Sequence, residues 1–121
     1  MRDYKKLRAF ELADQLALSV YRQTAAFPKH EQFGLTSQLR RAAVSAASNI
    51  VEGCARRSEA DYLHFLDMSY GSVREVEYQL SLAFRLGYLD ESQYPPLAQS
   101  SDEASRVLNG LINALRKETR S

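Results

Sequence analysis

The chain has 121 residues, of which 45% are hydrophobic and 26% are charged, and its formal net charge at pH 7 is +1. This composition predicts one globular domain over residues 1–121 and excludes a disordered chain. No apolar run approaches the length needed to cross a bilayer, so we expect no membrane association. Because the total charge is near zero, a case for nucleic-acid binding depends on how the charges are distributed.

The N-terminus and the single cysteine indicate the compartment. Basic residues open the sequence, but the apolar stretch of a secretory signal does not follow them. Cys54 has no second cysteine with which to form an internal disulfide. We therefore expect a cytoplasmic protein.

The first predicted helix covers about residues 7–27. Its apolar and small residues step by three and four from Phe10 to Phe27, which is the spacing of one helix face. Pro28 then ends the pattern, and Gly34 lies in the following turn.

The second and third helices are predicted over about residues 35–55 and 59–87. Ser58 followed by Asp61 resembles a capping box and marks the start of the third helix. Gly87 fits the position just after the end of that helix, where glycine is favoured.

The fourth helix is predicted over about residues 95–118. Pro95 and Pro96 fit its first turn, where the missing backbone N–H groups cost nothing. Four helices with short connections predict an all-α fold, an antiparallel up-down-up-down four-helix bundle.

The second helix is apolar on two sides, which indicates that it is buried on two sides. One stripe contains Ala43, Ala46 and Ile50, and the other contains Val44, Ala47, Val51 and Cys54. The pattern fits either a tightly packed internal helix or a subunit interface, and the sequence favours neither.

Arg40 and Arg41 lie near the start of this helix, where the helix dipole does not favour cations. We expect them to be paired with acids of the third helix, which offers Glu75 and Glu77. A buried or half-buried Arg41–Glu75 ion pair is favoured over a phosphate site, because buried charges must be paired.

The sequence disfavours an enzyme. A thiol nucleophile would require Cys54 with His30 or His64, and we interpret Cys54 as a small buried apolar side chain. Asp61 and His64 have the spacing of a helical metal-ligand pair, but no second copy exists to complete a di-metal site. No glycine-rich phosphate loop occurs either, so we expect no metal, no cofactor and no small-molecule substrate.

The charges are unevenly distributed along the chain. Residues 1–8 carry a net +3, residues 116–121 a net +2, and residues 56–61 no net charge. In an up-down bundle these segments meet at one end, which then carries +5 while the rest carries −4. The candidate nucleic-acid-binding residues at this end are Lys5, Lys6, Arg8, Arg56, Arg57, Arg116 and Lys117.

Helix-end chemistry explains part of this charge. The four candidates in residues 56–57 and 116–117 lie at helix C-termini, where the dipole favours cations. Lys5, Lys6 and Arg8 precede or open the first helix, against the dipole. We single these three out as functional, with a solvated basic tail as the alternative.

Several motifs point to a known family. QLRRAAVSAASNIVEG, the preceding FPKHEQFGLTS and the later YLHFLDMSYGSVREVEYQL resemble a bacterial four-helix-bundle family first noted as proteins encoded in intervening sequences of 23S ribosomal RNA genes. YKKLRAFELADQLALSVY and VLNGLINALRK also match, so the resemblance covers nearly the whole chain. The family includes the accessory variability protein of diversity-generating retroelements, a nucleic-acid-binding homopentamer that associates with a reverse transcriptase.

The resemblance implies a homo-oligomer, a pentamer in the form of a parallel ring, with its basic ends gathered on one face. It implies RNA or DNA as a partner, with a reverse transcriptase or another protein as a further one. Asn49 and Glu52 match the family's Asn-Ile-Ala-Glu-Gly motif, and we interpret them as helix–helix hydrogen-bonding residues. Val51 replaces the alanine of that motif, and Ala46-Ala47 stands where the family usually has Ile-Pro or a similar pair. The chain also lacks the strongly basic total charge of the retroelement relative.

Two functions are therefore carried forward. The first is a non-enzymatic accessory protein that associates with RNA or DNA through the basic end of the bundle. The alternative is a structural or protein-interaction oligomer that binds no nucleic acid.

Overall fold

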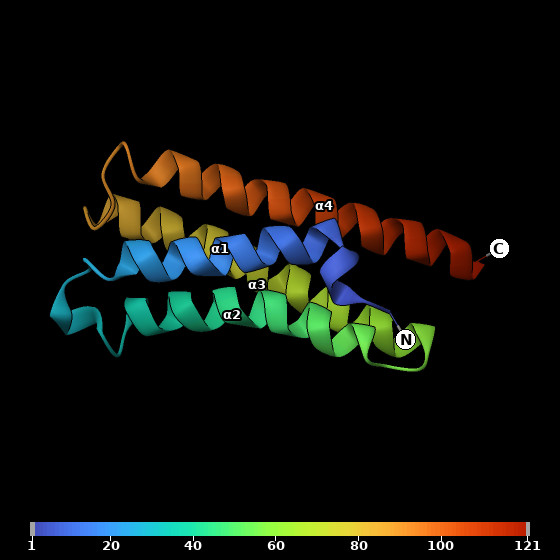
Figure 1. Ribbon diagram of the computed structural model, residues 1–121. Coiled ribbons are helices and arrows are strands. Elements are labelled where there is room, and N and C mark those ends of the chain that lie inside the picture. The colour runs from blue at the N-terminus through green and yellow to red at the C-terminus, as the bar shows by residue number, and fades with distance from the viewer. Residues whose placement is uncertain (1, 121) are drawn as a thin grey trace.

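A computed structural model describes residues 2–120, with Thr119 and Arg120 described in their backbone alone. It contains four helices, α1 (Arg8–Thr24), α2 (Leu35–Cys54), α3 (Glu59–Arg85) and α4 (Tyr94–Arg120). Successive helices run in opposite directions side by side (Figure 1). Two short 3-10 helices, η1 (Tyr4–Lys6) and η2 (Lys29–Glu31), precede α1 and α2. The predicted all-α four-helix bundle is confirmed.

The first helix ends earlier than its apolar periodicity indicates. Thr24 closes α1, and its hydroxyl donates to the carbonyl of Val20 at 2.7 Å. Phe27 is still buried, but it reaches the core from the turn beyond the helix. The apolar pattern therefore recorded burial correctly and overestimated the length of the helix.

The ends of α3 follow local sequence signals. The Ser58 hydroxyl accepts a hydrogen bond from the backbone N–H of Asp61 at 3.1 Å, which caps the first turn. At the other end Gly87 has a φ of +83°, in the left-handed region that favours glycine. Its N–H donates to the carbonyl of Phe84, and the N–H of Tyr88 donates to that of Ala83. These two bonds form a Schellman motif.

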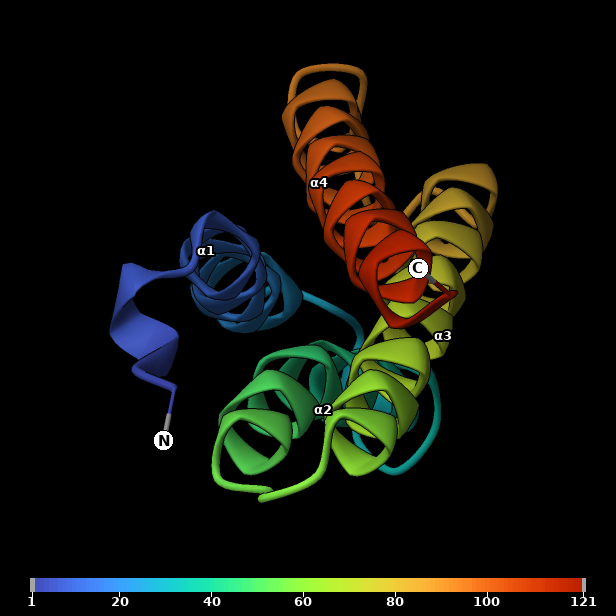
Figure 2. The ribbon, with the colours of Figure 1, turned by 90° about the vertical axis from the view of Figure 1, so that its right-hand side faces the viewer.

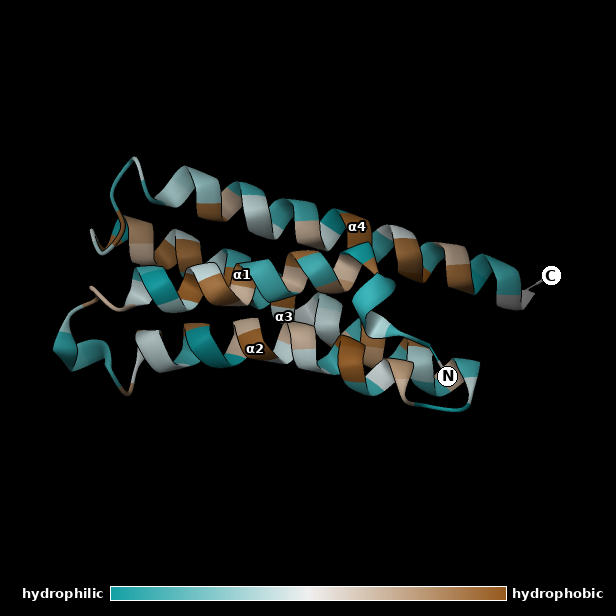
Figure 3. Cartoon of the chain, viewed as in Figure 1, coloured by the Kyte–Doolittle hydropathy of each residue, from teal (hydrophilic) through white to brown (hydrophobic). Residues whose placement is uncertain are grey.

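The core lies along the axis shared by the four helices. Hydrophobic faces turn toward one another and hydrophilic faces turn outward (Figure 3). Each helix contributes fully buried aliphatic side chains, among them Leu16, Leu39, Leu66, Leu80 and Leu108.

Helices α2 and α3 approach closely where α2 carries small residues. A Cβ on Gly53 would lie 2.9 Å from the Cβ of Phe65 and 3.3 Å from Cδ1 of Tyr62. Farther along, the buried Ser69 hydroxyl donates to the backbone carbonyl of Ala46 at 2.6 Å. The inner stripe of α2 thus serves close helix packing.

The second apolar stripe of α2 divides in the structure. Cys54 is 1% exposed and joins the core, whereas Val44 is 41% exposed. Ala47 and Val51 lie half-buried between these extremes. The outer part of this stripe, defined as Val44, Ala47 and Val51, remains accessible for contact with another molecule.

The carboxylate of Glu31 caps the N-terminus of α2. Oε1 accepts the backbone N–H of Leu35 at 3.0 Å, and Oε2 accepts the hydroxyl of Tyr88 at 2.8 Å. A Cβ on Gly34 would lie 2.6 Å from the same Oε1, so glycine leaves room for this cap. The bond from Leu35, followed by the one from Tyr88, lowers the pKa of Glu31.

Candidate nucleic-acid interface

The segments that carry the candidate cations lie at one end of the bundle. The start of the chain, the α2–α3 turn and the end of α4 face the same way in Figures 1 and 2. We call this the basic end and define it by seven exposed residues: Lys5, Lys6, Arg8, Arg56, Arg57, Arg116 and Lys117. Arg120 also entered the sum of charges, but its side chain lies outside the described part.

Two of these cations are occupied by acids of the same molecule. Arg8 contacts Glu103 of α4 at 2.6 Å, and Arg116 contacts Asp67 of α3 at 2.5 Å. Arg8 lies at the N-terminus of α1, where the partial positive charge of the helix dipole disfavours a cation. The carboxylate of Glu103 supplies the negative charge that offsets this. Arg8 therefore has a structural partner, which makes it a weaker candidate for phosphate contact than Lys5 and Lys6.

Among the residues that the structure describes, the other five cations of the basic end have no acidic partner. Among the described residues no ion pair within 4 Å involves Lys5, Lys6, Arg56, Arg57 or Lys117. The Arg56 guanidinium lies 4.5 Å from the centre of the Phe65 ring, which orients it without neutralising it. Unpaired cations at one end of the molecule can bind phosphates.

Arg2 fixes the geometry of this end, although the sequence did not single it out. Its guanidinium lies 3.8 Å from the centre of the Tyr62 ring and 2.5 Å from a carboxylate oxygen of Glu59. It also donates to the carbonyl of Arg56 at 3.4 Å. Arg2 thus ties residues 2–7, which we call the N-terminal strap, to the α2–α3 turn. No local sequence signal connects residues so far apart in the chain.

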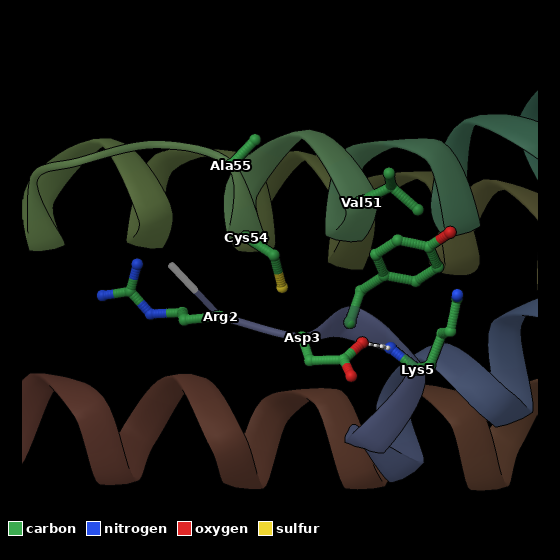
Figure 4. A pocket seen from close by; sticks show the side chains of 7 residues that line it. Arg2, Asp3, Lys5, Val51, Cys54 and Ala55 are labelled. Atoms are coloured by element: carbon green, nitrogen blue, oxygen red, sulfur yellow. Dashed lines mark hydrogen bonds between the residues drawn. The ribbon is translucent and has the colours of Figure 1, made fainter.

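A hollow of about 370 Å³ lies between the strap and the end of α2 (Figure 4). Its lining residues are Arg2, Asp3, Tyr4, Lys5, Val51, Cys54 and Ala55. A second hollow of about 590 Å³ lies beside Arg2, Ala55, Arg56 and Arg57. Lys5 of the strap and Arg56 and Arg57 of the α2–α3 turn therefore line neighbouring hollows that share Arg2 and Ala55.

The thiol of Cys54 lies at this hollow. The sulfur of Cys54 points toward the strap in Figure 4, and burial raises the pKa of the thiol. Burial also raises the pKa of the neighbouring Tyr62 to about 12. Both groups therefore stay protonated near neutral pH, which agrees with the interpretation of Cys54 as a buried apolar side chain.

The expected Arg41–Glu75 ion pair is wrong. Both side chains are exposed and line one hollow, but no ion pair joins them in the described part of the chain. Arg41 lies on the side of α2 opposite the core, where water solvates the charge and no partner is required. Glu77 pairs instead with Arg74, one turn earlier in α3, at 3.2 Å.

Arg40 has partners, but they belong to α1 and carry no charge. Its Nε donates to the Thr24 hydroxyl at 2.9 Å, and a terminal nitrogen donates to the Tyr21 carbonyl at 3.3 Å. The guanidinium also lies 4.6 Å from the centre of the Tyr21 ring. The sequence argument missed these partners because it considered only acids of α3.

Asn49 does not bridge α2 and α3 directly. Its amide donates to the carbonyl and hydroxyl of Ser45, one turn earlier in α2, at 2.9 and 3.0 Å. The link to α3 is made by Ser72, whose hydroxyl donates to that of Ser45 at 3.0 Å. Glu52 is exposed and makes no side-chain hydrogen bond among the described residues. The helix–helix role expected of Asn49 and Glu52 thus belongs to Ser45 and Ser72.

No metal site is apparent in the part of the chain that the structure describes. There, no group of three or more His, Cys, Asp or Glu side chains could hold an ion. Asp61 and His64 are both exposed. Within the same residues, no helix combines the length and apolar character that a bilayer span requires.

Comparison with known proteins gives a family and a fold. The model of a family described as 23S rRNA-intervening sequence protein matches residues 5–110. No curated protein matches at a significant level. A similar solved structure is that of a protein with unknown function from the S23 ribosomal protein family of Bacteroides thetaiotaomicron. The two share 24% identity and a TM-score of 0.77, over 86% of this chain and 97% of that one. Neither description names an enzymatic activity.

Proposed function

Because this chain belongs to the 23S rRNA-intervening sequence protein family, we propose that it is a non-enzymatic accessory protein that associates with RNA or DNA through its basic end. One observation carries the proposal. The basic end gathers five exposed cations that have no acidic partner within 4 Å among the described residues. Such cations bind phosphates and release the counterions that surround a nucleic acid.

The N-terminal strap gives these cations a defined arrangement. Lys5 and Lys6 lie on η1, which Arg2 holds beside the α2–α3 turn. Arg57 extends from that turn. The strap and the turn together form a surface that can contact the phosphate backbone without reading base sequence.

The test is the binding of a fluorescently labelled structured RNA, measured at salt concentrations from about 50 to 200 mM. The wild-type protein is expected to bind tightly at low salt and to lose affinity steeply as salt rises. The double variant Lys5→Ala/Lys6→Ala should bind more weakly, and its salt dependence should fall by about one unit of log–log slope for each lost phosphate contact.

The matched control removes two exposed cations from the opposite end, in the variant Arg22→Ala/Arg85→Ala. This control removes two positive charges, as the variant Lys5→Ala/Lys6→Ala does. An equal loss of affinity in the two variants would therefore refute the assignment of binding to the basic end. If the wild-type protein binds no RNA or DNA at the lowest salt, the proposed function itself is wrong.

The outer stripe of α2 supports a second candidate, a protein-interaction oligomer. Val44, Ala47 and Val51 form an accessible apolar row on a helix whose other apolar stripe already fills the core. Assembly through such a row should persist at high salt, because it does not depend on charge. Sedimentation velocity at low and high salt tests this candidate, and a monomer at both would contradict it.

A further inference from the structure

Phe33 projects from the end of the bundle opposite the basic end. It lies in the turn between η2 and α2, and 91% of its side chain is exposed. The other four phenylalanines of the chain are buried or half-buried. This ring therefore gains no packing within the molecule and is free to contact a ligand.

The ring stands beside a hollow of about 390 Å³, which we call the Phe33 hollow. Its lining residues are Tyr21, Gln32, Phe33, Thr36, Ser37, Arg40 and Arg41. Two aromatic rings therefore share the hollow with two guanidinium groups and with hydrogen-bonding side chains. This lining differs from the continuous apolar groove that a hydrophobic peptide helix requires.

Thr36 is a nearly buried residue at the wall of the hollow. The residue is only 7% exposed, and its hydroxyl oxygen is buried with no hydrogen-bond partner among the described residues. Thr36 lines the Phe33 hollow and also an adjoining one of about 210 Å³. Because this oxygen is buried, a ligand in the hollow does not reach it, and the side chains available for contact are exposed ones such as Phe33 and Arg41.

The charge of the hollow selects for an anion. Arg41 is exposed and has no ion pair among the described residues, and Arg40 has only uncharged partners. No carboxylate lines the hollow. Glu31, an acid of the preceding η2, uses its two oxygens on the N–H of Leu35 and the hydroxyl of Tyr88.

We propose that the Phe33 hollow binds one unpaired nucleotide of a single-stranded RNA or DNA, with the base stacked on Phe33 and a phosphate beside Arg41. An exposed aromatic ring next to a guanidinium group without an ion pair, here Phe33 beside Arg41 in the described part of the chain, is the combination by which proteins bind single strands without sequence preference. This inference rests on the proposed association with nucleic acids, and it adds a second contact that acts on unpaired bases.

The test uses Phe33→Trp, because the chain contains no tryptophan and the new indole would be its sole tryptophan fluorophore. Single-stranded oligonucleotides are expected to quench this fluorescence by stacking, whereas a duplex of the same sequence is not. Ribo- and deoxyribo-oligonucleotides of one sequence then show which nucleic acid the hollow prefers.

A pair of further variants separates stacking from simple apolar contact. Phe33→Tyr keeps an aromatic face and should retain the affinity for a labelled single strand. Phe33→Leu keeps apolar bulk but lacks that face, and should weaken binding by about ten-fold. Phe33 is almost fully exposed, so neither substitution should change the helical circular dichroism.

The outcomes distinguish this inference from the proposed function. If the fluorescence stays unquenched while binding still depends on Lys5 and Lys6, the hollow is not a nucleotide site, although the proposed function stands. If the wild-type protein binds no nucleic acid, both are wrong. If the Phe33 variants change sedimentation and not nucleic-acid affinity, the hollow is a protein contact and the inference is overturned.

Discussion

At the scale of single residues, Glu31 shows how one carboxylate couples two parts of the bundle. It caps the N-terminus of α2 and accepts a hydrogen bond from Tyr88, which follows the end of α3. Both bonds are stronger to the ionised form, and they lower the pKa of Glu31 below its ordinary value of 4.5. The ionised group therefore stabilises the folded state above that value, and the contribution is lost as the pH falls through the lowered pKa.

We predict that Glu31→Gln lowers the melting temperature at pH 7, because glutamine has a similar shape but no charge for these two donors. The difference from the wild-type protein should shrink as the pH falls below 4.5. Thermal unfolding followed by circular dichroism between acid and neutral pH measures it. Glu91→Gln, at an exposed position beyond α3, is the control. A constant difference at all pH values would show that the ionised cap is not its cause.

The sequence predicts the role of a residue well when the residue's partners lie close to it along the chain. The cap at Ser58 and the turn at Gly87 are local, so the motifs around them were sufficient. Arg2 contacts residues more than fifty positions away, and no motif encodes that contact. Arg41 was assigned a partner on the assumption that it is buried, but burial depends on the rotation of α2 about its axis.

At the scale of elements, α2 and α3 meet at a distance that only small residues permit. A side chain at Gly53 would press against Phe65 and Tyr62, both of which belong to α3. The sequence indicated this closeness through the run of alanine, serine and glycine in α2. It left open whether the closeness serves the core or an interface, because periodicity shows which residues share a face and not what covers that face.

Gly53→Ala should destabilise the fold by about 1–3 kcal/mol, the usual cost of forcing an extra carbon into a packed contact. Gly71→Ala is the matched control, because Gly71 lies within α3 and a Cβ there would meet nothing within 4 Å. It should stabilise the fold by about 0.5–1 kcal/mol, since alanine is the better helix former. Urea unfolding of both variants measures the difference, and two changes of the same sign would contradict the close packing at Gly53.

At the scale of the whole molecule, the topology sorts the charges. Short connections force the chain to reverse at each turn, so the strap, the α2–α3 turn and the end of α4 meet at one end (Figure 2). This meeting was predictable from the number of helices alone. The Phe33 hollow was not, because its lining residues come from α1, the following turn and α2, and they meet only when the helices pack.

The outer stripe of α2 gives a prediction at the same scale. Val44→Asp places a charge on the exposed part of the stripe and leaves the buried stripe unchanged. If copies of the chain assemble through this stripe, sedimentation velocity should show the variant shifted toward the monomer, because burying an unpaired carboxylate is costly. Ser48→Asp, at an exposed position one turn further along α2, is a control of equal charge. Ser48 lies beside the outer stripe and not within it, so Ser48→Asp should shift the sedimentation toward the monomer less than Val44→Asp does. An equal shift in the two variants would contradict the assignment of the contact to Val44.

The position of Cys54 has a consequence for how the molecule meets oxidants. It is the chain's single cysteine, it is 1% exposed, and it lies beneath the N-terminal strap. With the strap in place the sulfur offers peroxide or a disulfide reagent little accessible surface, and burial raises the pKa of the thiol, which favours its less reactive protonated form. We therefore expect the rate at which this thiol is oxidised to report how often the strap moves away from the end of α2.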